Sequence, residues 1–270
     1  MIKRTAVLHE KYMLSGGLAD ISSGRLVDGT PVVVRSLQRQ HRWKSRVRKR
    51  FVSGIKARAS LPSHPNVIPS LSYAVGLNPY EILPEIEGCT LLDWRNRNGD
   101  LLSKYAPTML IQIAEALDHV HRNGYLHLDM KPENILVSSV GDHLRCHLTD
   151  FDLVLDSSKI WHDKKLRFGT FSYMAPEHLQ DGTISLRSDV FSYGVVAYLL
   201  CCGQLPFPGN TPSASRESKL SGNFKPEPIG ALCKWLPPAV AEFIMRCLSC
   251  DPELRPGFIG IAIRDLKKVY

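Results

Sequence analysis

The sequence predicts an α+β protein with two lobes, a smaller β-rich lobe over residues 1–83 and a larger helical lobe over residues 88–270. In the N-terminal part, short apolar segments alternate with turn signals, which is typical of strands. From Leu91 onward, apolar residues recur at helical spacing instead. Pro84 cannot donate a backbone hydrogen bond to a sheet, so residues 84–87 are expected to form an extended hinge.

Within the smaller lobe, Asp28-Gly29 is a hairpin signal that precedes the apolar strand of "PVVVRSL". Residues 43–61 fit one helix, although Gly54 in its middle costs about 1 kcal/mol relative to alanine. The segment "PYEILPEIEG" is predicted to form a strand that leads into the hinge.

The larger lobe is predicted to contain several long helices. Apolar residues from Met109 to Val120 share one helical face, and Asn123-Gly124 supplies a stop signal. A second helix over 188–202 is apolar on most sides and is therefore expected to be buried. A third helix is predicted over 238–249.

The composition is that of a globular protein, since 44% of the 270 residues are hydrophobic and 22% are charged. The longest strongly apolar run, Gly194–Cys202, is too short for a membrane helix, so no membrane span is expected. The N-terminal residues lack the apolar stretch of a signal peptide. The seven cysteines show no framework spacing, which favours a reducing compartment and predicts a cytoplasmic location.

A basic run from Arg39 to Arg50 accounts for most of the net charge of +8. The run contains no acidic residue, and its cations are Arg39, Arg42, Lys44, Arg46, Arg48, Lys49 and Arg50. One interpretation is a solvated helix face, and the other is a contact surface for an acidic partner. No aromatic-rich basic pattern accompanies the run, so nucleic acid is not the expected partner.

The strongest motifs lie in the C-terminal part. In chain order they are "HLDMKPEN", "DFD", "GTFSYMAPE", "SDVFSYGV" and "DPELRPGF". Together they closely resemble the motifs of a eukaryotic-type serine/threonine protein kinase domain, in the order of that family. The resemblance covers the chain from end to end and implies a two-lobed protein kinase-like fold, with ATP and Mg²⁺ as cofactors and protein substrates.

The resemblance also implies roles for individual residues. Asp129 matches the catalytic carboxylate that orients the acceptor hydroxyl, and Lys131 matches the cation beside the transferred phosphoryl group. Asn134 and Asp150 match the two magnesium ligands, both hard oxygen donors.

Further matches carry structural roles. Residues 150–177 correspond to the activation segment, in which Thr170 matches a threonine that contacts the catalytic aspartate and lysine. Glu177 and Arg255 match a buried ion pair, and Asp189 matches the acid that braces the catalytic loop.

The smaller lobe departs from the family at its nucleotide clamp, that is, the glycine loop and the lysine–glutamate pair. Leu14 and Ala19 replace two loop glycines, while Gly16 remains. Arg35 stands in place of the phosphate-anchoring lysine, and Gly54 falls where the family has the helix glutamate. The remaining contacts that the resemblance implies for the nucleotide are Ile21, Val33, Leu83, Glu85, Ile86 and Leu136.

Two substitutions adjoin the catalytic motifs. Leu128 replaces the arginine before the catalytic aspartate, so activation by a phosphorylated activation segment is not expected in its usual form. Asp152 replaces the glycine of the metal-binding motif. Because Arg35 lacks its helix carboxylate, we hypothesise that Asp152 is its compensating partner.

Three interpretations of the function follow. The first is an active serine/threonine kinase with an atypical nucleotide clamp, which the retained acids and Lys131 favour. The second is a pseudokinase that acts as a binding or scaffold module. The third is a small-molecule kinase of the aminoglycoside or choline type, which shares the His-x-Asp-x4-Asn pattern. The segment "GTFSYMAPE" with Glu177 and Arg255 argues against the third, since those enzymes lack such a segment.

Overall fold

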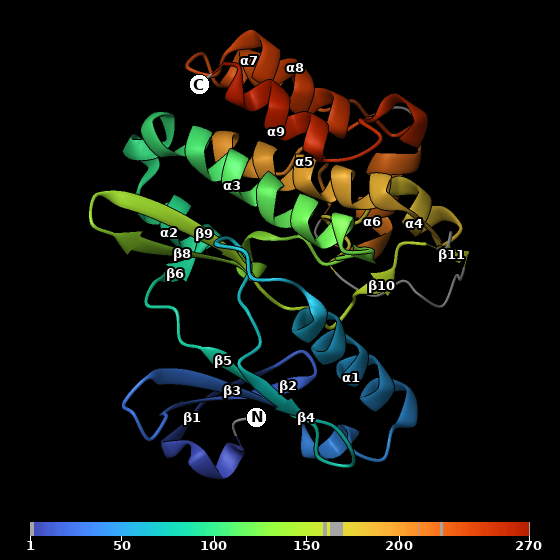
Figure 1. Cartoon of the computed structure of the whole chain (residues 1–270). Coiled ribbons are helices and arrows are strands. Elements are labelled where there is room, and N and C mark those ends of the chain that lie inside the picture. Colours follow the sequence, from blue (N-terminus) through green and yellow to red (C-terminus); the bar gives the residue numbers. More distant parts are fainter. Residues whose placement is uncertain (1–2, 159–160, 163–169, 210, 222–223, 270) are drawn as a thin grey trace. The chain divides into compact units, whose positions relative to one another are not determined.

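The computed structural model divides into two compact units (Figure 1). The first unit is Met1–Glu87 with Thr149–Val154, and the second is Gly88–Leu148 with Leu155–Tyr270. The structure describes residues 3–158, 161–162, 170–209, 211–221 and 224–269. The first unit is built on a sheet and the second is mainly helical, which confirms the predicted α+β class.

One short segment within the range predicted for the larger lobe groups with the first unit. The sequence assigned all of residues 88–270 to the larger lobe, whereas residues 149–154 belong to the first unit. The reason is local packing. Arg35 pairs with the carboxylates of Asp150 and Asp152, and the backbone of Phe151 lies against Gly54.

The first unit contains a five-stranded antiparallel sheet in the order β1-β2-β3-β5-β4. Its strands are β1 (Leu8–Gly16), β2 (Ala19–Arg25), β3 (Pro31–Leu37), β4 (Ser72–Ala74) and β5 (Tyr80–Pro84). The predicted hairpin joins β2 to β3. Gly29 there has a φ of +86°, and the carboxylate of Asp28 accepts a hydrogen bond from Thr30 N–H at 2.9 Å.

Helix α1 (Ser45–Ser60) confirms the predicted helix of the smaller lobe. The sheet buries apolar side chains on both faces, since neighbouring residues of a strand point to opposite sides. One face carries the cluster of Val7, Val32, Val34 and Ile82. On the other face, Phe51 and Ile55 of α1 pack against Ala19 and Leu37. Two short 3-10 helices, η1 (Arg4–Ala6) and η2 (Arg39–His41), complete the unit.

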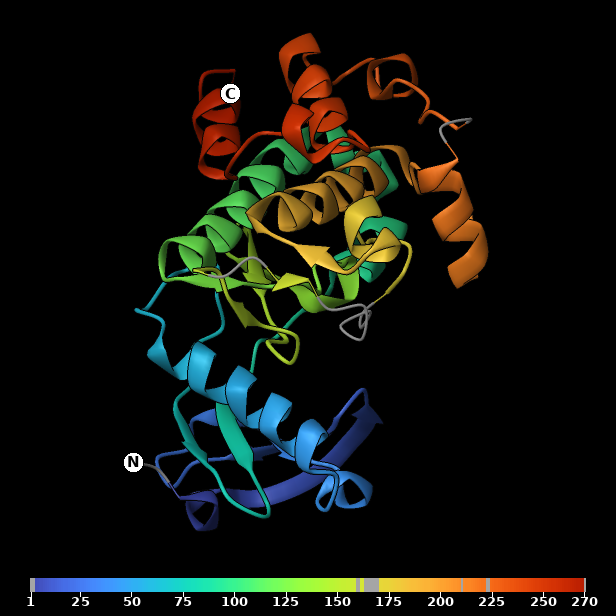
Figure 2. The ribbon, with the colours of Figure 1, turned by 90° about the vertical axis from the view of Figure 1, so that its right-hand side faces the viewer.

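The second unit is organised around α3 (Leu102–Arg122) and α5 (Leu186–Cys202), which pack against each other (Figure 2). The other helices are α2 (Leu91–Arg97), α4 (Pro176–Gln180), α6 (Pro212–Leu220), α7 (Ile229–Leu232), α8 (Pro238–Cys247) and α9 (Gly260–Lys267). The 3-10 helices are η3 (Gly99–Leu101), η4 (Pro132–Asn134) and η6 (Pro252–Leu254). As predicted, α5 is buried along most of its length, and Gly203 ends it with a φ of +75°.

Short strands frame the loops of the second unit. Strands β6 (Cys89–Thr90), β8 (Ile135–Val140) and β9 (His143–Leu148) form one sheet. Strand β7 (Tyr125–Leu126) pairs with β10 (Leu155–Asp156), and β11 (Trp161–His162) pairs with β12 (Thr183–Ile184). The segment of the predicted catalytic aspartate is therefore held between β7 and β8.

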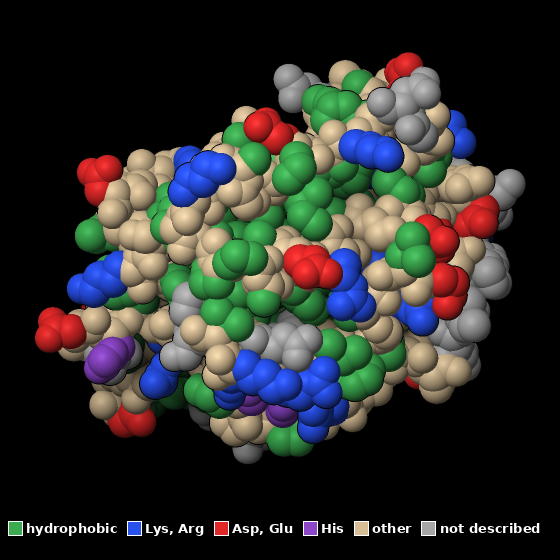
Figure 3. Space-filling model, turned by 90° about the horizontal axis from the view of Figure 1, so that it is seen from above, with side chains coloured by type: hydrophobic (Ala, Val, Ile, Leu, Met, Phe, Trp, Pro, Cys, Tyr) green, Lys and Arg blue, Asp and Glu red, His purple; other side chains and the backbone are tan. Residues whose placement is uncertain are grey.

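The surface mixes side chains of different kinds. Figure 3 shows hydrophobic side chains interspersed with charged ones of both signs on the face seen from above. Exposed apolar residues such as Leu232 and Phe258 are ordinary for a folded protein. Across the described ranges, no helix has the length and apolarity needed to cross a membrane.

Candidate active site

The second unit brings three of the predicted site residues together. Lys131 Nζ lies 2.9 Å from Asp129 Oδ2. Asn134 Nδ2 donates hydrogen bonds to the backbone oxygen and to Oδ2 of Asp129, both at 2.9 Å. The 3-10 turn η4 follows Lys131 and ends at Asn134, so the chain folds back on Asp129. One carboxylate is thus held between a cation and an amide.

Asp189, in the first turn of α5, braces this loop as the resemblance implied. Its carboxylate accepts hydrogen bonds from the backbone N–H groups of His127 at 2.7 Å and Leu128 at 2.8 Å. Leu128 has a φ of +63°, a left-handed conformation that costs energy for a leucine and therefore needs such support. Burial alone would raise the pKa of Asp189, but hydrogen bonds from His121 and His127 outweigh it and lower the pKa below its ordinary value.

The first unit contains a buried charge cluster centred on Arg35 of β3. Arg35 Nη1 donates a hydrogen bond to Glu81 of β5. Its Nη2 lies 3.1 Å from Asp152 Oδ1 and 3.3 Å from Asp150 Oδ1. The Arg35 residue is only 7% exposed. The hypothesised contact between Arg35 and Asp152 is therefore present. Arg35 also contacts the carboxylates of Glu81 and Asp150.

The members of this cluster depend on one another for their charge. Burial would lower the pKa of Arg35, yet the pKa is raised because Asp152, Glu81 and Asp150 surround the guanidinium. Burial raises the pKa of Asp152 to about 6, even though Arg35 favours its ionised form. Removing Arg35 would therefore leave Asp152 as a poorly compensated buried charge, whereas Arg35 keeps Glu81 and Asp150 as partners if Asp152 is removed.

Two members of the cluster were not found from the sequence. Glu81 is fully buried, and Arg58 of α1 is 1% exposed with its Nε 3.4 Å from Glu81 Oε2. The Arg58 guanidinium also lies 4.7 Å from the centre of the Phe151 ring. A signal for Glu81 existed, because it is an acid in the apolar strand "YEILP". The family pattern pointed to the positions of Gly54 and Asp152 instead.

Steric crowding explains why residue 54 is a glycine. A Cβ atom at this position would lie 2.4 Å from the backbone oxygen of Phe151, closer than any side chain tolerates. Helix α1 can approach residues 149–154 at this distance only with glycine here. The position where the family has its helix glutamate is therefore closed in this chain.

The residues predicted to contact adenine lie partly on one face of the first sheet. Ile21 is directly opposite Arg35, and Val33 is directly opposite Leu83, so these side chains share the face of the Arg35 cluster. Leu83 is 3% exposed, whereas Ile21 and Val33 are half-buried. The other predicted positions are Gly16 at the end of β1, Glu85 and Ile86 after β5, and Leu136 on β8 of the second unit.

The predicted activation segment is described only in part, because residues 159–160 and 163–169 lie outside the described residues. Within the described part, Thr170 and Asp129 line the same small hollow. Lys219 of α6, which the sequence analysis did not single out, donates hydrogen bonds to the backbone oxygens of Phe171, Ser172 and Met174 at 2.7–2.9 Å. Burial lowers the pKa of Lys219 to about 7.

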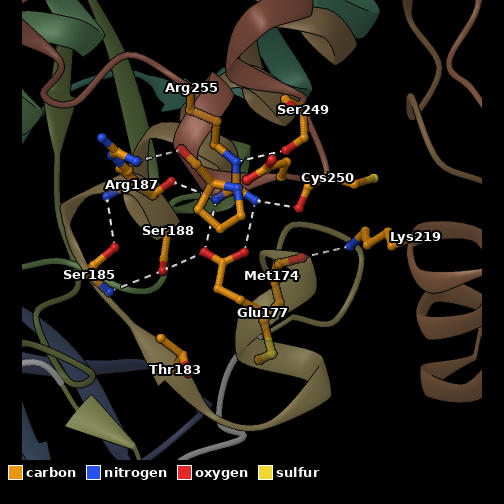
Figure 4. A network of polar contacts seen from close by, with 12 residues as sticks. Met174, Glu177, Thr183, Ser185, Arg187, Ser188, Lys219, Ser249, Cys250 and Arg255 are labelled. Atoms are coloured by element: carbon orange, nitrogen blue, oxygen red, sulfur yellow. Dashed lines mark hydrogen bonds and ion pairs between the residues drawn. The ribbon is translucent and has the colours of Figure 1, made fainter. Parts of the chain in front are cut away.

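The expected ion pair between Glu177 and Arg255 closes the segment (Figure 4). The pairing is bidentate, with N–O distances of 2.9 and 2.8 Å. Arg255 also donates to the backbone oxygens of Arg187, Ser249 and Cys250. Its remaining donors are thus used by the chain around it.

The donor chemistry at the two predicted metal ligands fits Mg²⁺. Asp150 offers a carboxylate whose side chain is 32% exposed, and Asn134 offers an amide oxygen. Among the described residues, no group of three or more His, Cys, Asp or Glu side chains forms a ready-made metal cage. Mg²⁺ typically needs only one or two carboxylates together with the phosphates of a substrate, so the Asp150 carboxylate and the Asn134 amide oxygen are donors of the right kind.

The chain is similar to known protein kinases. Residues 12–266 match the family described as "Protein kinase domain". A probable serine/threonine-protein kinase of Clostridium perfringens is 30% identical over 242 residues, which cover 88% of this chain and 34% of that protein. The serine/threonine-protein kinase PrkC of Bacillus subtilis is 28% identical over 262 residues, 94% of this chain and 39% of that protein. The chain thus spans little more than a third of the length of these relatives.

Proposed function

Because the chain belongs to the protein kinase domain family, we propose that it transfers the γ-phosphoryl group of ATP to serine or threonine hydroxyls of protein substrates. The observation that carries this proposal is that Lys131 and Asn134 both contact the carboxylate of Asp129. Similar chains named serine/threonine-protein kinases supply the substrate class.

Each residue has a separate role in this proposal. Asp129 accepts a hydrogen bond from the acceptor hydroxyl, orients it and takes its proton as the hydroxyl oxygen bonds to the γ-phosphorus and the bond from that phosphorus to the bridging oxygen breaks, which releases ADP. Lys131, already 2.9 Å from Asp129, offsets negative charge on the transferred group. Asp150 and Asn134 would each offer an oxygen ligand to Mg²⁺, which neutralises phosphate charge when bound.

The proposed nucleotide contacts are drawn from both units. Ile21 and Val33, both half-buried on the face that carries Arg35, would present apolar surface to the adenine, and Leu83 and Leu136 are proposed for the same role from the family resemblance. Glu85 and Ile86 supply backbone groups for its edge, and Gly16 allows the β1–β2 hairpin to approach phosphate. Arg35 contributes the positive charge that the family supplies with lysine.

Magnesium-dependent ATP binding followed by label transfer tests this function. The thermal unfolding temperature is expected to rise with ATP and Mg²⁺ together and not with either alone. Transfer of labelled phosphate to the chain or to a generic protein substrate should follow. A shift without label transfer would favour the pseudokinase instead.

One observation favours the pseudokinase as the second candidate. Arg35 is buried and already contacts Glu81, Asp150 and Asp152, so its guanidinium is occupied by protein carboxylates. A phosphate must compete with these carboxylates for Arg35. In the pseudokinase, the cluster would serve only to hold residues 149–154.

A double-mutant cycle between Arg35 and Asp152 separates these candidates. Arg35→Lys and Asp152→Gly are each expected to weaken ATP binding, because an ammonium cannot reproduce the several contacts of the guanidinium fork and Asp152→Gly removes one of the three carboxylates that orient it. The double variant should recover part of the loss, with a coupling energy of about 1 kcal/mol or more. The measurement is the ATP dissociation constant in the presence of Mg²⁺. Purely additive losses would favour the pseudokinase.

The basic run is proposed to recruit an acidic protein partner. The exposed cations of the run are Arg39, Lys44, Arg46 and Lys49, whereas Arg48 and Arg50 donate hydrogen bonds to backbone oxygens within the first unit. The exposed cations are therefore the residues to change. Replacing all four exposed cations with serine should abolish retention of a poly-glutamate peptide at low salt. Moderate salt should abolish it for the unmodified chain. Equal retention by both proteins would leave the solvated helix face as the interpretation.

A further inference from the structure

The charges in the first unit form an alternating row. Asp150 and Asp152 contact Arg35, Arg35 contacts Glu81, and Glu81 contacts Arg58. Glu81 is 0% exposed and both arginines are under 10% exposed, so water screens these interactions little. Burying so many charges is costly unless each is paired, which indicates that the row has a purpose beyond stability.

Glu81 occupies the central place in this row. It lies directly opposite Arg35 in the register between β5 and β3, and these strands are hydrogen-bonded neighbours. Cross-strand partners of this kind have their Cβ atoms about 5 Å apart, so a glutamate reaches an arginine without distorting either strand. The pairing is therefore built into the sheet.

Arg58 is ion-paired with Glu81 on the side away from Arg35. Its Nε lies 3.4 Å from Glu81 Oε2, while Arg35 holds Oε1. Of the carboxylates in the described part of the chain, Glu81 is the one ion-paired with Arg58. Phe151 packs against the same guanidinium, at 4.7 Å from its ring centre. Arg58 thus connects Glu81 to the segment that carries Asp150.

The helix position that would otherwise supply a carboxylate is unavailable. At Gly54, a side chain would collide with the Phe151 backbone. The position on α1 where the family has its glutamate is therefore closed in this chain. A buried acid on β5, Glu81, contacts Arg35 instead.

We infer that Glu81 is the positioning carboxylate of the nucleotide clamp, moved from helix α1 to strand β5 and held there by Arg58. It is a positioning residue that acts through Arg35 on Asp150 and Asp152. Control of a kinase through its helix depends on bringing a helix glutamate to the anchoring cation. Here that cation and its carboxylate are on paired strands, so their pairing does not depend on a carboxylate from α1. This inference rests on the proposed function for its consequence in nucleotide binding, but not for its structural part.

The test compares Glu81→Gln with the double variant Glu81→Leu/Arg58→Met. The single change leaves Arg58 without a charged partner and is expected to lower both stability and ATP affinity. The double change removes one charge of each sign and fills the space with apolar side chains, which buried ion pairs often tolerate. It should fold with near-normal stability while its Mg²⁺-dependent ATP affinity stays reduced on the order of tenfold.

Hydrogen exchange of residues 149–154 gives a second measurement that needs no nucleotide. In the double variant these amides should exchange faster than in the unmodified chain, since Arg35 has lost the partner that fixes it. Glu10→Gln is the matched control, because Glu10 pairs with Arg4 at the surface of the same unit and should change neither quantity.

The outcomes separate the two proposals. A double variant with unchanged exchange and unchanged affinity would overturn the positioning role and leave Glu81 as a structural residue. An unmodified chain that binds no ATP would overturn the proposed function. In that case, faster exchange in the double variant would still support the positioning of residues 149–154 by Glu81, and unchanged exchange would overturn it.

Discussion

Asp129→Asn is expected to lower the rate of phosphoryl transfer by about two to four orders of magnitude while leaving ATP affinity and folding intact. Asparagine has the size of aspartate, so the loop keeps its shape. Its amide cannot accept the proton of the incoming hydroxyl. The side-chain oxygen still accepts hydrogen bonds from Lys131 and Asn134, which contact Oδ2 in the unmodified chain.

Glu133→Gln is the matched control for this prediction. Glu133 belongs to the same loop, in η4, but its side chain is exposed. The substitution removes one negative charge close to Asp129 in the sequence without touching the proposed base. Turnover should therefore stay within a factor of a few of the unmodified chain. If Asp129→Asn keeps its turnover, or loses ATP binding and turnover together, the assigned role of Asp129 is wrong.

The arrangement around Asp129 could be predicted because its geometry is local. Asp129, Lys131 and Asn134 lie within six residues, and a single turn brings them together. The brace by Asp189 was also predictable, although Asp189 is distant in the chain, since its motif is recognisable by itself. Motifs of this kind carry their own structural context.

The Arg35 cluster was only partly predictable because it depends on non-local pairing. The contact between Arg35 and Glu81 follows from the register of β3 against β5, which no short motif specifies. A shift of one residue would have turned Glu81 to the opposite face of the sheet. Asp152 was identified because it breaks a recognisable pattern, whereas Glu81 lies in a strand with no such pattern.

The packing of residues 149–154 also escaped prediction. The sequence shows a glycine in a helix, which by itself predicts only a weaker helix. The structure gives Gly54 a tertiary role, since the Phe151 backbone lies where a side chain would be. Close backbone approach is determined by both surfaces together, so neither segment predicts it alone.

Arg255→Met is expected to lower the free energy of unfolding of the second unit by about 3–5 kcal/mol. The Arg255 side chain is 0% exposed and holds both carboxylate oxygens of Glu177. Methionine fills a similar volume and keeps contact with Phe191, whose ring lies 4.9 Å from the guanidinium. The loss is therefore mainly electrostatic, because Glu177 remains a buried charge and three backbone oxygens lose their donor.

Denaturant unfolding followed by circular dichroism measures this loss, with Glu253→Gln as control. Glu253 pairs with the neighbouring Arg187, but its side chain is 80% exposed, so the control should cost less than about 1 kcal/mol. Adding Glu177→Gln to Arg255→Met should recover part of the stability, because it removes the carboxylate charge that Arg255→Met leaves unpaired. A loss no larger than that of the control would show that solvent reaches Glu177 and that the pair does not hold the segment. A loss that Glu177→Gln fails to relieve would instead assign the stability to the three backbone oxygens around Arg255.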